Sequence, residues 1–259
     1  MRVTVLGSGT AVPSFERFPA GHLVQAEGLH VAVDLGPGVL RRLAQAGVDP
    51  AQLDAVYLTH YHTDHCADLA ALLFALRSPR YAGRKRLRVA GGPGLRAFLH
   101  GLAAVWPWAV AKGYELEALE TGPGRADLGA LRIEGFAVQH TDASLAWRVT
   151  AADGATVTFS GDADLGKDLL AASRAAELFV CDAAFPDSLR QEGHLTPGLA
   201  ARLAAEARVG TLCLTHFYPE CDGHDLAAQA RAHFAGPLVL ARDLDAFDVR
   251  PGAARLVAR

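Results

Sequence analysis

Short apolar runs bounded by glycine, proline and aspartate alternate along the chain with segments whose apolar residues recur every three or four positions. The first pattern predicts buried strands, and the second predicts amphipathic helices. The predicted strands cover residues 2–6, 22–27, 29–34, 55–59, 86–90, 130–139, 144–150, 155–160, 177–181, 210–214 and 237–240. The predicted helices cover residues 37–46, 65–76, 94–104, 166–173, 197–207 and 224–234. This alternation predicts a layered protein of strands and helices.

Capping and turn residues define the bounds of some of these elements better than those of others. Helix 197–207 has Thr196 as its cap and Pro197 at its first position, which is the residue order preferred at helix starts. Residues 149–157 predict a hairpin with an Asp-Gly turn. Residues 106–129 contain several glycines and prolines, so this stretch predicts loop and irregular strand.

A faint internal repeat links the two halves of the chain. Residues 58–61 (Leu-Thr-His-Tyr) resemble residues 214–217 (Leu-Thr-His-Phe), and each run follows a predicted strand. The repeat predicts two β-rich halves packed sheet on sheet, with helices outside and a site at one edge; chance similarity of so short a string is the alternative. Since no Pro/Gly/Ser-rich or charged linker separates the halves, residues 1–259 are predicted to form one domain.

Composition narrows the class of protein. Of 259 residues, 51% are hydrophobic, which is enough for a sizeable core, and the net charge of −3 argues against a broad cationic surface for nucleic acid. The four cysteines (66, 181, 213 and 221) show no paired spacing, so we expect reduced, mostly packed thiols. The N-terminus lacks a signal-peptide pattern, and no segment approaches the about 20 apolar residues of a membrane span. A cytoplasmic protein without a membrane partner is therefore expected.

The densest chemistry lies directly after the apolar run 53–58. His60, His62, Asp64 and His65 fall within six positions, and imidazole and carboxylate are the groups that bind zinc and similar metals. An extended segment points His60 and His62 the same way, and a helix starting near Asp64 would bring Asp64 and His65 to a second point nearby. This spacing predicts two adjacent metal positions; a polar turn with solvated histidines is the alternative.

The H-x-H-x-D-H run is the signature of the metallo-β-lactamase superfamily, and the chain resembles that family over nearly its whole length. Within the family it is most similar to the phosphodiesterase branch that includes ribonuclease Z. The other parts of the family pattern follow in order: Asp34 at a strand end, His140 and Asp162 after strands, His194 ahead of a helix, and His216 after a strand. The resemblance implies a four-layer αββα sandwich with two sheets packed face to face.

The resemblance also implies how the metals are held. One ion would take His60, His62 and His140, the other would take Asp64, His65 and His216, and Asp162 would bridge the two. This ligand set suits two zinc ions, with manganese or iron as substitutes. Asp34 is expected to hydrogen-bond a ligand histidine or the bridging solvent; its alternative role is that of a turn former at the end of a strand.

Two such cations lower the pKa of bound water toward about 7 and neutralise charge on a phosphoryl oxygen. The implied reaction is therefore attack of a metal-bridged hydroxide on a phosphodiester. In the family, Asp64 can accept the proton of the bridging water, and His194 lies near the scissile phosphate, where it stabilises or protonates the leaving oxygen. Here the element around His194 lacks the family's serine, because residue 195 is leucine. A loop histidine before a capped helix is the alternative for His194.

The substrate is expected to be small. Ribonuclease Z grips tRNA with a long arm between the positions of His140 and Asp162, but only 22 positions separate these residues here. Glu220 also stands where those enzymes carry an arginine. We therefore predict a small phosphodiester such as a cyclic nucleotide. The alternatives are a tRNA 3′-end endonuclease acting on RNA, a hydrolase of thioesters, lactams or sulfate esters, and a non-catalytic binding module. A homodimer is compatible with the family.

Two groups of residues have open roles. Arg84, Lys85, Arg86 and Arg88 form a basic run that would meet phosphate or lie on a solvated edge strand. Four aromatic residues would line a substrate cleft or belong to the core: Trp106, Trp108, Phe217 and Tyr218.

Overall fold

The computed structural model describes residues 1–83 and 86–258. Its strands are β1 (Arg2–Gly7), β2 (Gly21–Ala26), β3 (Leu29–Leu35), β4 (Ala55–Tyr57), β5 (Arg86–Gly91), β6 (Glu115–Glu120), β7 (Gly124–Arg125), β8 (Arg132–Ala137), β9 (Leu145–Thr150), β10 (Thr156–Phe159), β11 (Leu178–Asp182), β12 (Thr211–Thr215), β13 (Leu238–Leu240), β14 (Ala246–Arg250) and β15 (Ala253–Ala258). Its α-helices are α1 (Val39–Gln45), α2 (Thr63–Cys66), α3 (Asp68–Ala75), α4 (Leu95–Val105), α5 (Lys167–Ser173), α6 (Pro197–Ala207) and α7 (Leu226–Arg231). Short 3₁₀ turns occupy Pro50–Gln52, Pro79–Tyr81, Asp187–Leu189 and Pro219–Cys221. Among the residues described, no helix combines the length and apolar character needed to cross a bilayer.

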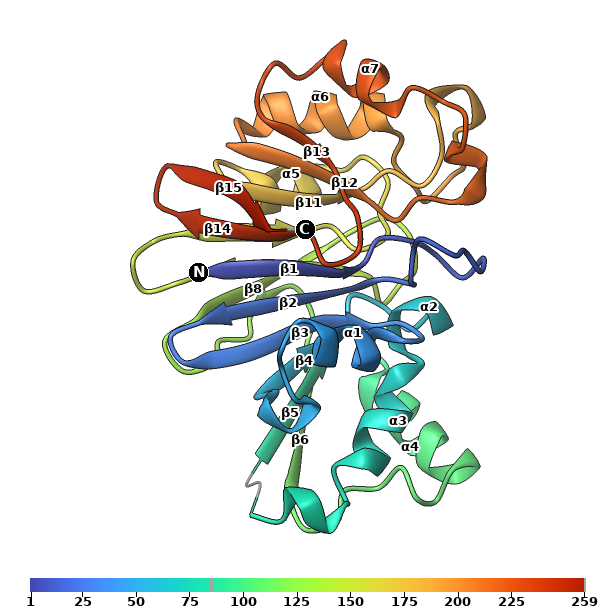
Figure 1. Ribbon diagram of the computed structural model, residues 1–259, viewed down its shortest axis with the longest axis vertical. Helices are drawn as coiled ribbons and strands as arrows, with labels where there is room; N and C mark the ends of the chain where they lie inside the picture. Colours follow the sequence, from blue (N-terminus) through green and yellow to red (C-terminus); the bar gives the residue numbers. More distant parts are fainter. Residues whose placement is uncertain (84–85, 259) are drawn as a thin grey trace.

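The strands form two sheets (Figure 1). Within the described residues, one sheet has the order β15-β14-β1-β2-β3-β4-β5-β6 and the other has the order β13-β12-β11-β10-β9-β8-β7. The C-terminal hairpin β14–β15 crosses over to join the first sheet, where β14 pairs antiparallel with β1. Both sheets are mixed: β3 to β6 run parallel in one, and β10 to β13 run parallel in the other.

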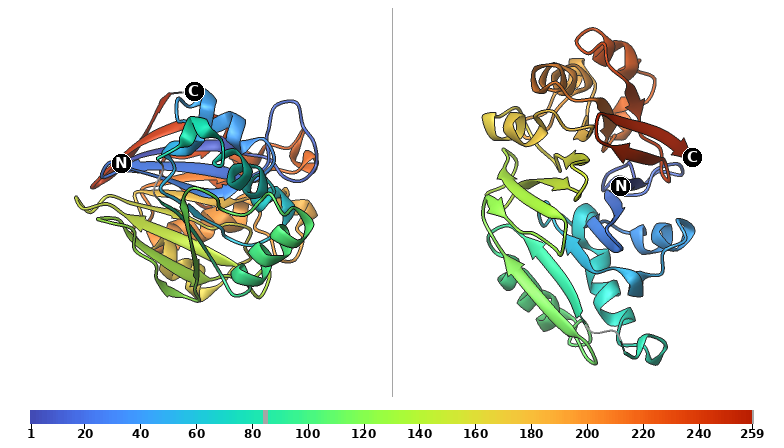
Figure 2. Two further views of the ribbon diagram at one scale, coloured as in Figure 1. Left: turned by 90° about the horizontal axis from the view of Figure 1, so that it is seen from below. Right: turned by 90° about the vertical axis from the view of Figure 1, so that its left-hand side faces the viewer.

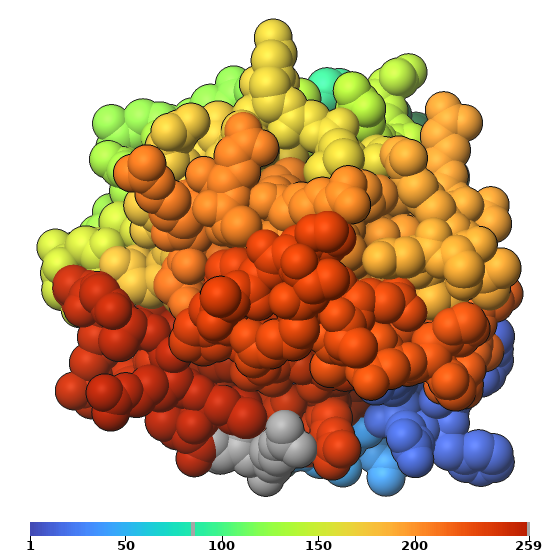
Figure 3. Space-filling view, turned by 90° about the horizontal axis from the view of Figure 1, so that it is seen from above, coloured from blue at the N-terminus to red at the C-terminus, as the bar shows by residue number. Residues whose placement is uncertain are grey.

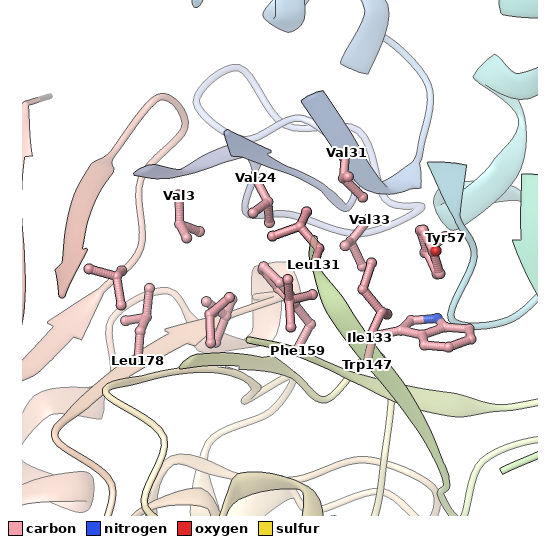
Figure 4. Close-up of a cluster of buried hydrophobic side chains, with 14 of the residues drawn as sticks. Val3, Val24, Val31, Val33, Tyr57, Leu131, Ile133, Trp147, Phe159 and Leu178 are labelled. Carbon is pink, nitrogen blue, oxygen red and sulfur yellow. The ribbon is translucent and has the colours of Figure 1, made fainter. Parts of the chain in front are cut away.

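Three apolar clusters define four layers. One cluster fills the space between the sheets, where Val3, Val24 and Val33 meet Ile133, Phe159 and other buried side chains (Figure 4). A second cluster packs α5 to α7 on the outer face of the β7–β13 sheet, and a third packs α1 to α4 on the other sheet. The side views show the two sheets facing one another (Figure 2). The predicted αββα sandwich is confirmed.

Polar groups also join the sheets. The Trp147 indole donates to the carbonyl of Leu58 at 3.0 Å, and the backbone N–H of Leu145 donates to the carbonyl of Thr59 at 2.9 Å. Because Leu58 and Thr59 follow β4 directly, these bonds fix the backbone just ahead of His60.

Several boundaries differ from the predictions. The predicted helix 65–76 is two helices, α2 and α3, which meet at Ala67. Strands β14 and β15 were not predicted, and β6 and β7 lie within residues 106–129, which were predicted only as loop and irregular strand. The four cysteines are buried and none is in a disulfide.

The predicted edge position of the basic run is wrong for the residues described. Arg86 and Arg88 lie on β5, which is paired on both sides, by β4 and β6. Both guanidiniums pair with Glu117 of β6, at 2.6 and 2.8 Å. Arg84 and Lys85 lie outside the described residues. Glu117 would therefore compete with a phosphate for Arg86 and Arg88.

Candidate metal centre

The candidate site lies where strands of both sheets end. Parallel strands bring their carboxyl ends to one edge of a sheet, and ligands bind in the crevice beyond that edge. β3, β4, β10 and β12 each lead into a site segment at such an edge. All nine residues singled out from the sequence lie in these segments or directly beside them: Asp34, His60, His62, Asp64, His65, His140, Asp162, His194 and His216.

One group of ligand atoms comes from three histidines and a carboxylate. The ring nitrogens of His60 and His62 lie 3.0 Å apart, and those of His140 and His62 lie 3.1 Å apart. The Asp162 Oδ2 atom is 3.7 Å from His60 Nε2 and 3.5 Å from His140 Nε2. Two nitrogens at about 2.05 Å from a tetrahedral zinc ion are about 3.3 Å apart. The spacing of this group therefore fits one zinc-sized ion.

A second group lies on the other side of Asp162. Its Oδ1 atom is 3.1 Å from His65 Nε2 and 3.3 Å from His216 Nε2. The Asp64 Oδ2 atom lies 3.5 Å from His216 Nε2, and the Nε2 atoms of His65 and His216 are 3.3 Å apart. Each oxygen of Asp162 thus faces a different group of histidines, which is the arrangement of a carboxylate between two cations.

Asp34 orients the ring of His65. Its carboxylate is 2.8 Å from His65 Nδ1 and accepts 2.8 Å hydrogen bonds from both the backbone N–H and the hydroxyl of Thr59. A proton held on Nδ1 by Asp34 leaves Nε2 free to face Asp162. Thr59 also contacts His60 Nδ1 at 3.1 Å. The backbone of Asp34 has a φ of 62°, a left-handed conformation that L-residues adopt rarely and that clusters at functional sites.

Asp182 is the site residue that sequence analysis missed. It ends β11, it is 1% exposed, and its carboxylate lies 3.0 Å from His194 Nδ1 and 3.5 Å from His216 Nδ1. The available signal was a carboxylate at the end of an apolar strand, the same signal that identified Asp34. His140 is oriented separately, by the carbonyl of Gly193 at 3.0 Å from Nδ1.

Several buried side chains of the site favour their charged forms. Burial disfavours the charged form of His216, but Asp162 and Asp182 raise its pKa to about 10. Burial likewise opposes charge on His65, yet the neighbouring carboxylates hold its pKa well above the usual range. Burial opposes ionisation of Asp162 as well, but the nearby imidazoles keep its pKa well below the usual range. The protein therefore stabilises positive charge at the points that cations would occupy.

His60 completes the case for metal binding. Burial and the charge of His65 lower the pKa of His60 to about 2, so its imidazole is neutral and available as a ligand. Three buried polar atoms at the site have no hydrogen-bond partner among the described residues: Asp162 Oδ1, Asp182 Oδ1 and His216 Nδ1. Such orphaned groups are costly unless an ion or solvent satisfies them. The donor set therefore fits divalent metal ions.

The four aromatic residues with open roles divide into three cases. Phe217 is 4% exposed and belongs to the core, whereas Tyr218 is half-buried and packs edge-on against His216 at 5.7 Å between ring centroids. Trp106 and Trp108 are exposed and border an apolar cavity beside Phe74. Only Tyr218 adjoins the candidate metal centre.

Comparisons with known proteins show the family to which the chain belongs. The model of the β-lactamase superfamily domain matches residues 29–217. The chain is 32% identical to a ribonuclease Z of Bradyrhizobium sp. (strain ORS 278), covering 94% of this chain and 98% of that protein. The metallo-β-lactamase fold protein YhfI from Bacillus subtilis superposes with a TM-score of 0.83 at 26% identity, over 95% of this chain and 98% of that one. The short form of human tRNase Z shares the fold, with a TM-score of 0.78 at 22% identity, over 96% of this chain and 99% of that one.

The fold and the buried imidazole–carboxylate cluster define the class: a metal-dependent hydrolase acting on ester bonds. The chain belongs to the metallo-β-lactamase superfamily.

Proposed function

We propose that this protein is a two-zinc phosphodiesterase that cleaves small, nucleotide-like substrates. His60, His62 and His140 would hold one ion, and Asp64, His65 and His216 would hold the other, with manganese or iron as substitutes. The observation that carries this proposal is Asp162, whose two oxygens face the two histidine groups at 3.1 to 3.7 Å.

The bound ions would supply an activated water and neutralise charge on the phosphoryl group. The protein holds the geometry, because Asp34 and the Gly193 carbonyl fix the rings of His65 and His140. Asp64 lies at the edge of the second group and is the candidate to take the proton from the attacking water. Although burial raises the pKa of Asp64, its contacts with His216 lower the value to about 2, so the carboxylate is ionised at neutral pH.

His194 is the candidate donor to the leaving oxygen. Asp182 holds its Nδ1 at 3.0 Å, and its ring is stacked nearly parallel to that of His216, with centroids 5.6 Å apart. Burial disfavours charge on His194, but Asp182 raises its pKa above the ordinary value. An imidazole that keeps its proton near neutral pH suits general acid catalysis.

A small substrate is supported by the connection between His140 and Asp162. These positions are joined by the compact hairpin β9–β10, without a protruding arm among the described residues. The ribonuclease Z relative supports tRNA 3′-end cleavage as the second candidate. Hydrolysis of thioesters, lactams or sulfate esters at the same site is the third. A homodimer stays a prediction, which sedimentation velocity tests.

Turnover by zinc- or manganese-loaded protein distinguishes these functions. We expect hydrolysis of bis(p-nitrophenyl) phosphate and of cyclic nucleotides, and none of nitrocefin, S-lactoylglutathione or precursor tRNA. The His194→Ala variant should lose about 10²- to 10⁴-fold in kcat, while His100→Ala, at an exposed position on α4, should match the parent. Thioester or lactam turnover without phosphodiester turnover would refute the proposal, and unchanged kcat in His194→Ala would remove its assigned role.

A further inference from the structure

A second cavity opens beside the metal centre, on the far side of Tyr218. It has a volume of about 440 Å³ and lies between the β1–β2 loop and the segment that follows β12, which is within the size range of small-molecule sites. Phe15, Glu16 and Arg17 line it from the loop, and Tyr218 and Asp222 line it from the other side. The surface view from above shows blue N-terminal residues lying beside the orange and red C-terminal part of the chain (Figure 3).

The cavity adjoins the candidate metal centre at Tyr218. The Tyr218 ring borders the cavity and packs edge-on against both His216 and His194, at 5.7 and 6.2 Å between ring centroids. A neighbouring cavity of about 280 Å³ shares Ser14 and Arg17 with the first and is also lined by Asp64. The larger cavity is therefore the space next to the metal centre that a bound ligand would enter.

The walls of the cavity present planar groups. Phe15 is fully exposed on the β1–β2 loop, and Tyr218 is held by stacking on Phe185 at 4.7 Å. The Arg17 guanidinium lies 4.6 Å above the ring of Phe217 and is fixed by bonds to Ser8 Oγ and the carbonyl of Ala241, at 2.8 and 2.7 Å. Aromatic rings and guanidinium planes are the surfaces on which nucleobases stack.

The charges of the cavity disfavour a second phosphate. Glu16 and Asp222 line it together with Arg17, and Arg17 already has bonding partners on the protein. Carboxylates accept hydrogen bonds from the N–H groups that nucleobases carry, but they repel the next phosphate of an RNA strand or of a nucleoside polyphosphate.

We propose that this cavity binds the nucleobase of a mononucleotide substrate, with the base stacked against Phe15 and Tyr218 while the phosphate ester lies at the metal centre. This inference rests on the proposed phosphodiesterase function and narrows its substrate to an ester with one phosphate and one base. The β1–β2 loop then determines specificity.

Binding of reaction products to the zinc-loaded protein tests the inference separately from catalysis. Calorimetry should show adenosine or guanosine monophosphate binding at least about tenfold more tightly than ribose 5-phosphate, since stacking of one base accounts for about that much. Phe15→Ala should remove most of this advantage and leave ribose 5-phosphate binding unchanged. Phe74→Ala, which removes another exposed phenylalanine, on α3, should leave both affinities unchanged. Glu16→Lys should tighten binding of the nucleoside diphosphate relative to the monophosphate.

Equal affinity of the parent for the nucleotides and ribose 5-phosphate overturns the inference, and the phosphodiesterase proposal survives if bis(p-nitrophenyl) phosphate is still hydrolysed. If nucleotides bind more tightly than ribose 5-phosphate but no phosphodiester is hydrolysed, the cavity binds bases and the proposed reaction is wrong. If Phe15→Ala changes only the sedimentation coefficient and not nucleotide affinity, the loop is a contact between copies of the chain and the inference fails.

Discussion

Replacing Asp34 with asparagine should weaken zinc binding without unfolding the protein. Asp34 is 2% exposed and accepts three bonds of 2.8 Å, one from His65 and two from Thr59. An asparagine has the same shape and tolerates the left-handed backbone at this position. Its carbonyl can keep the bond to the Thr59 N–H, but its amide hydrogens then face His65 Nδ1 and turn that nitrogen into an acceptor.

The proton of His65 would then move to Nε2, the atom that faces Asp162 at 3.1 Å. A protonated nitrogen cannot bind a metal ion, so zinc affinity should fall by about 10- to 100-fold, or about 1.4 to 2.7 kcal/mol. Competition against a chromophoric chelator measures this loss, and circular dichroism checks the fold. The matched control is Asp54→Asn, because Asp54 accepts a 2.8 Å bond from the backbone N–H of His30 away from the site. A dissociation constant within twofold of the parent in Asp34→Asn would show that this carboxylate does not orient the ligand.

Three further predictions concern stability. Burial lowers the pKa of His22 to about 3, so the stability due to its neutral form is complete above about pH 6.5 and falls as the pH drops toward 3, by about 2 kcal/mol at pH 5. In urea unfolding of the metal-free protein, the free energy of unfolding of His22→Gln should therefore fall by about 2 kcal/mol less than that of the parent between pH 7 and 5. Parallel pH curves for the two proteins would contradict this. Gly161→Ala should lower the free energy of unfolding by more than about 2 kcal/mol, because φ is 59° and the added Cβ would lie 2.6 Å from the side chain of Thr59. The control Gly154→Ala, with φ of 93° and open space around the added Cβ, should lower it by only about 1 to 2 kcal/mol. Thermal or urea unfolding measures both. Removal of metal with EDTA should lower the melting temperature. Zinc at 100 times its dissociation constant should restore about 2.7 kcal/mol of the free energy of unfolding per ion. An unchanged melting temperature would count against the metal centre.

Sequence patterns predicted those helices and strands whose bounds are determined by residues close to them in the chain. Helix α6 begins where Thr196 and the proline after it predict, because the Thr196 hydroxyl caps the helix. Strand β6 was predicted only as part of a stretch of loop and irregular strand, because its sequence, Glu-Leu-Glu-Ala-Leu-Glu, favours helix. It is a strand because it pairs with β5 over six residues and because Glu117 meets the arginines of β5. Contacts between distant segments decided its state, and no local pattern contains them.

The site shows the same division. The residue types and spacing at His60 to His65 were enough to predict a metal site, because metal ligation restricts the chemistry so strongly. Convergence with His140, Asp162 and His216 was implied by the resemblance to the metallo-β-lactamase superfamily. Asp182 was missed because its partners, His194 and His216, lie 12 and 34 positions away in sequence. The β14–β15 hairpin was overlooked although Pro251 and Gly252 mark its turn. The single-domain assignment of residues 1–259 stays a prediction.

The ligands of the candidate centre come from both sheets: His60 and Asp64 follow the first sheet's β4, whereas Asp162 and His216 follow strands of the second. Bound ions would therefore join the sheets at their open edge, on top of the apolar layer that joins them elsewhere. Without ions, separation of the sheets should begin at that edge and expose the connecting loops to proteases. The lifetime of the protein in a cell would then follow the supply of metal, with no dedicated sensor required.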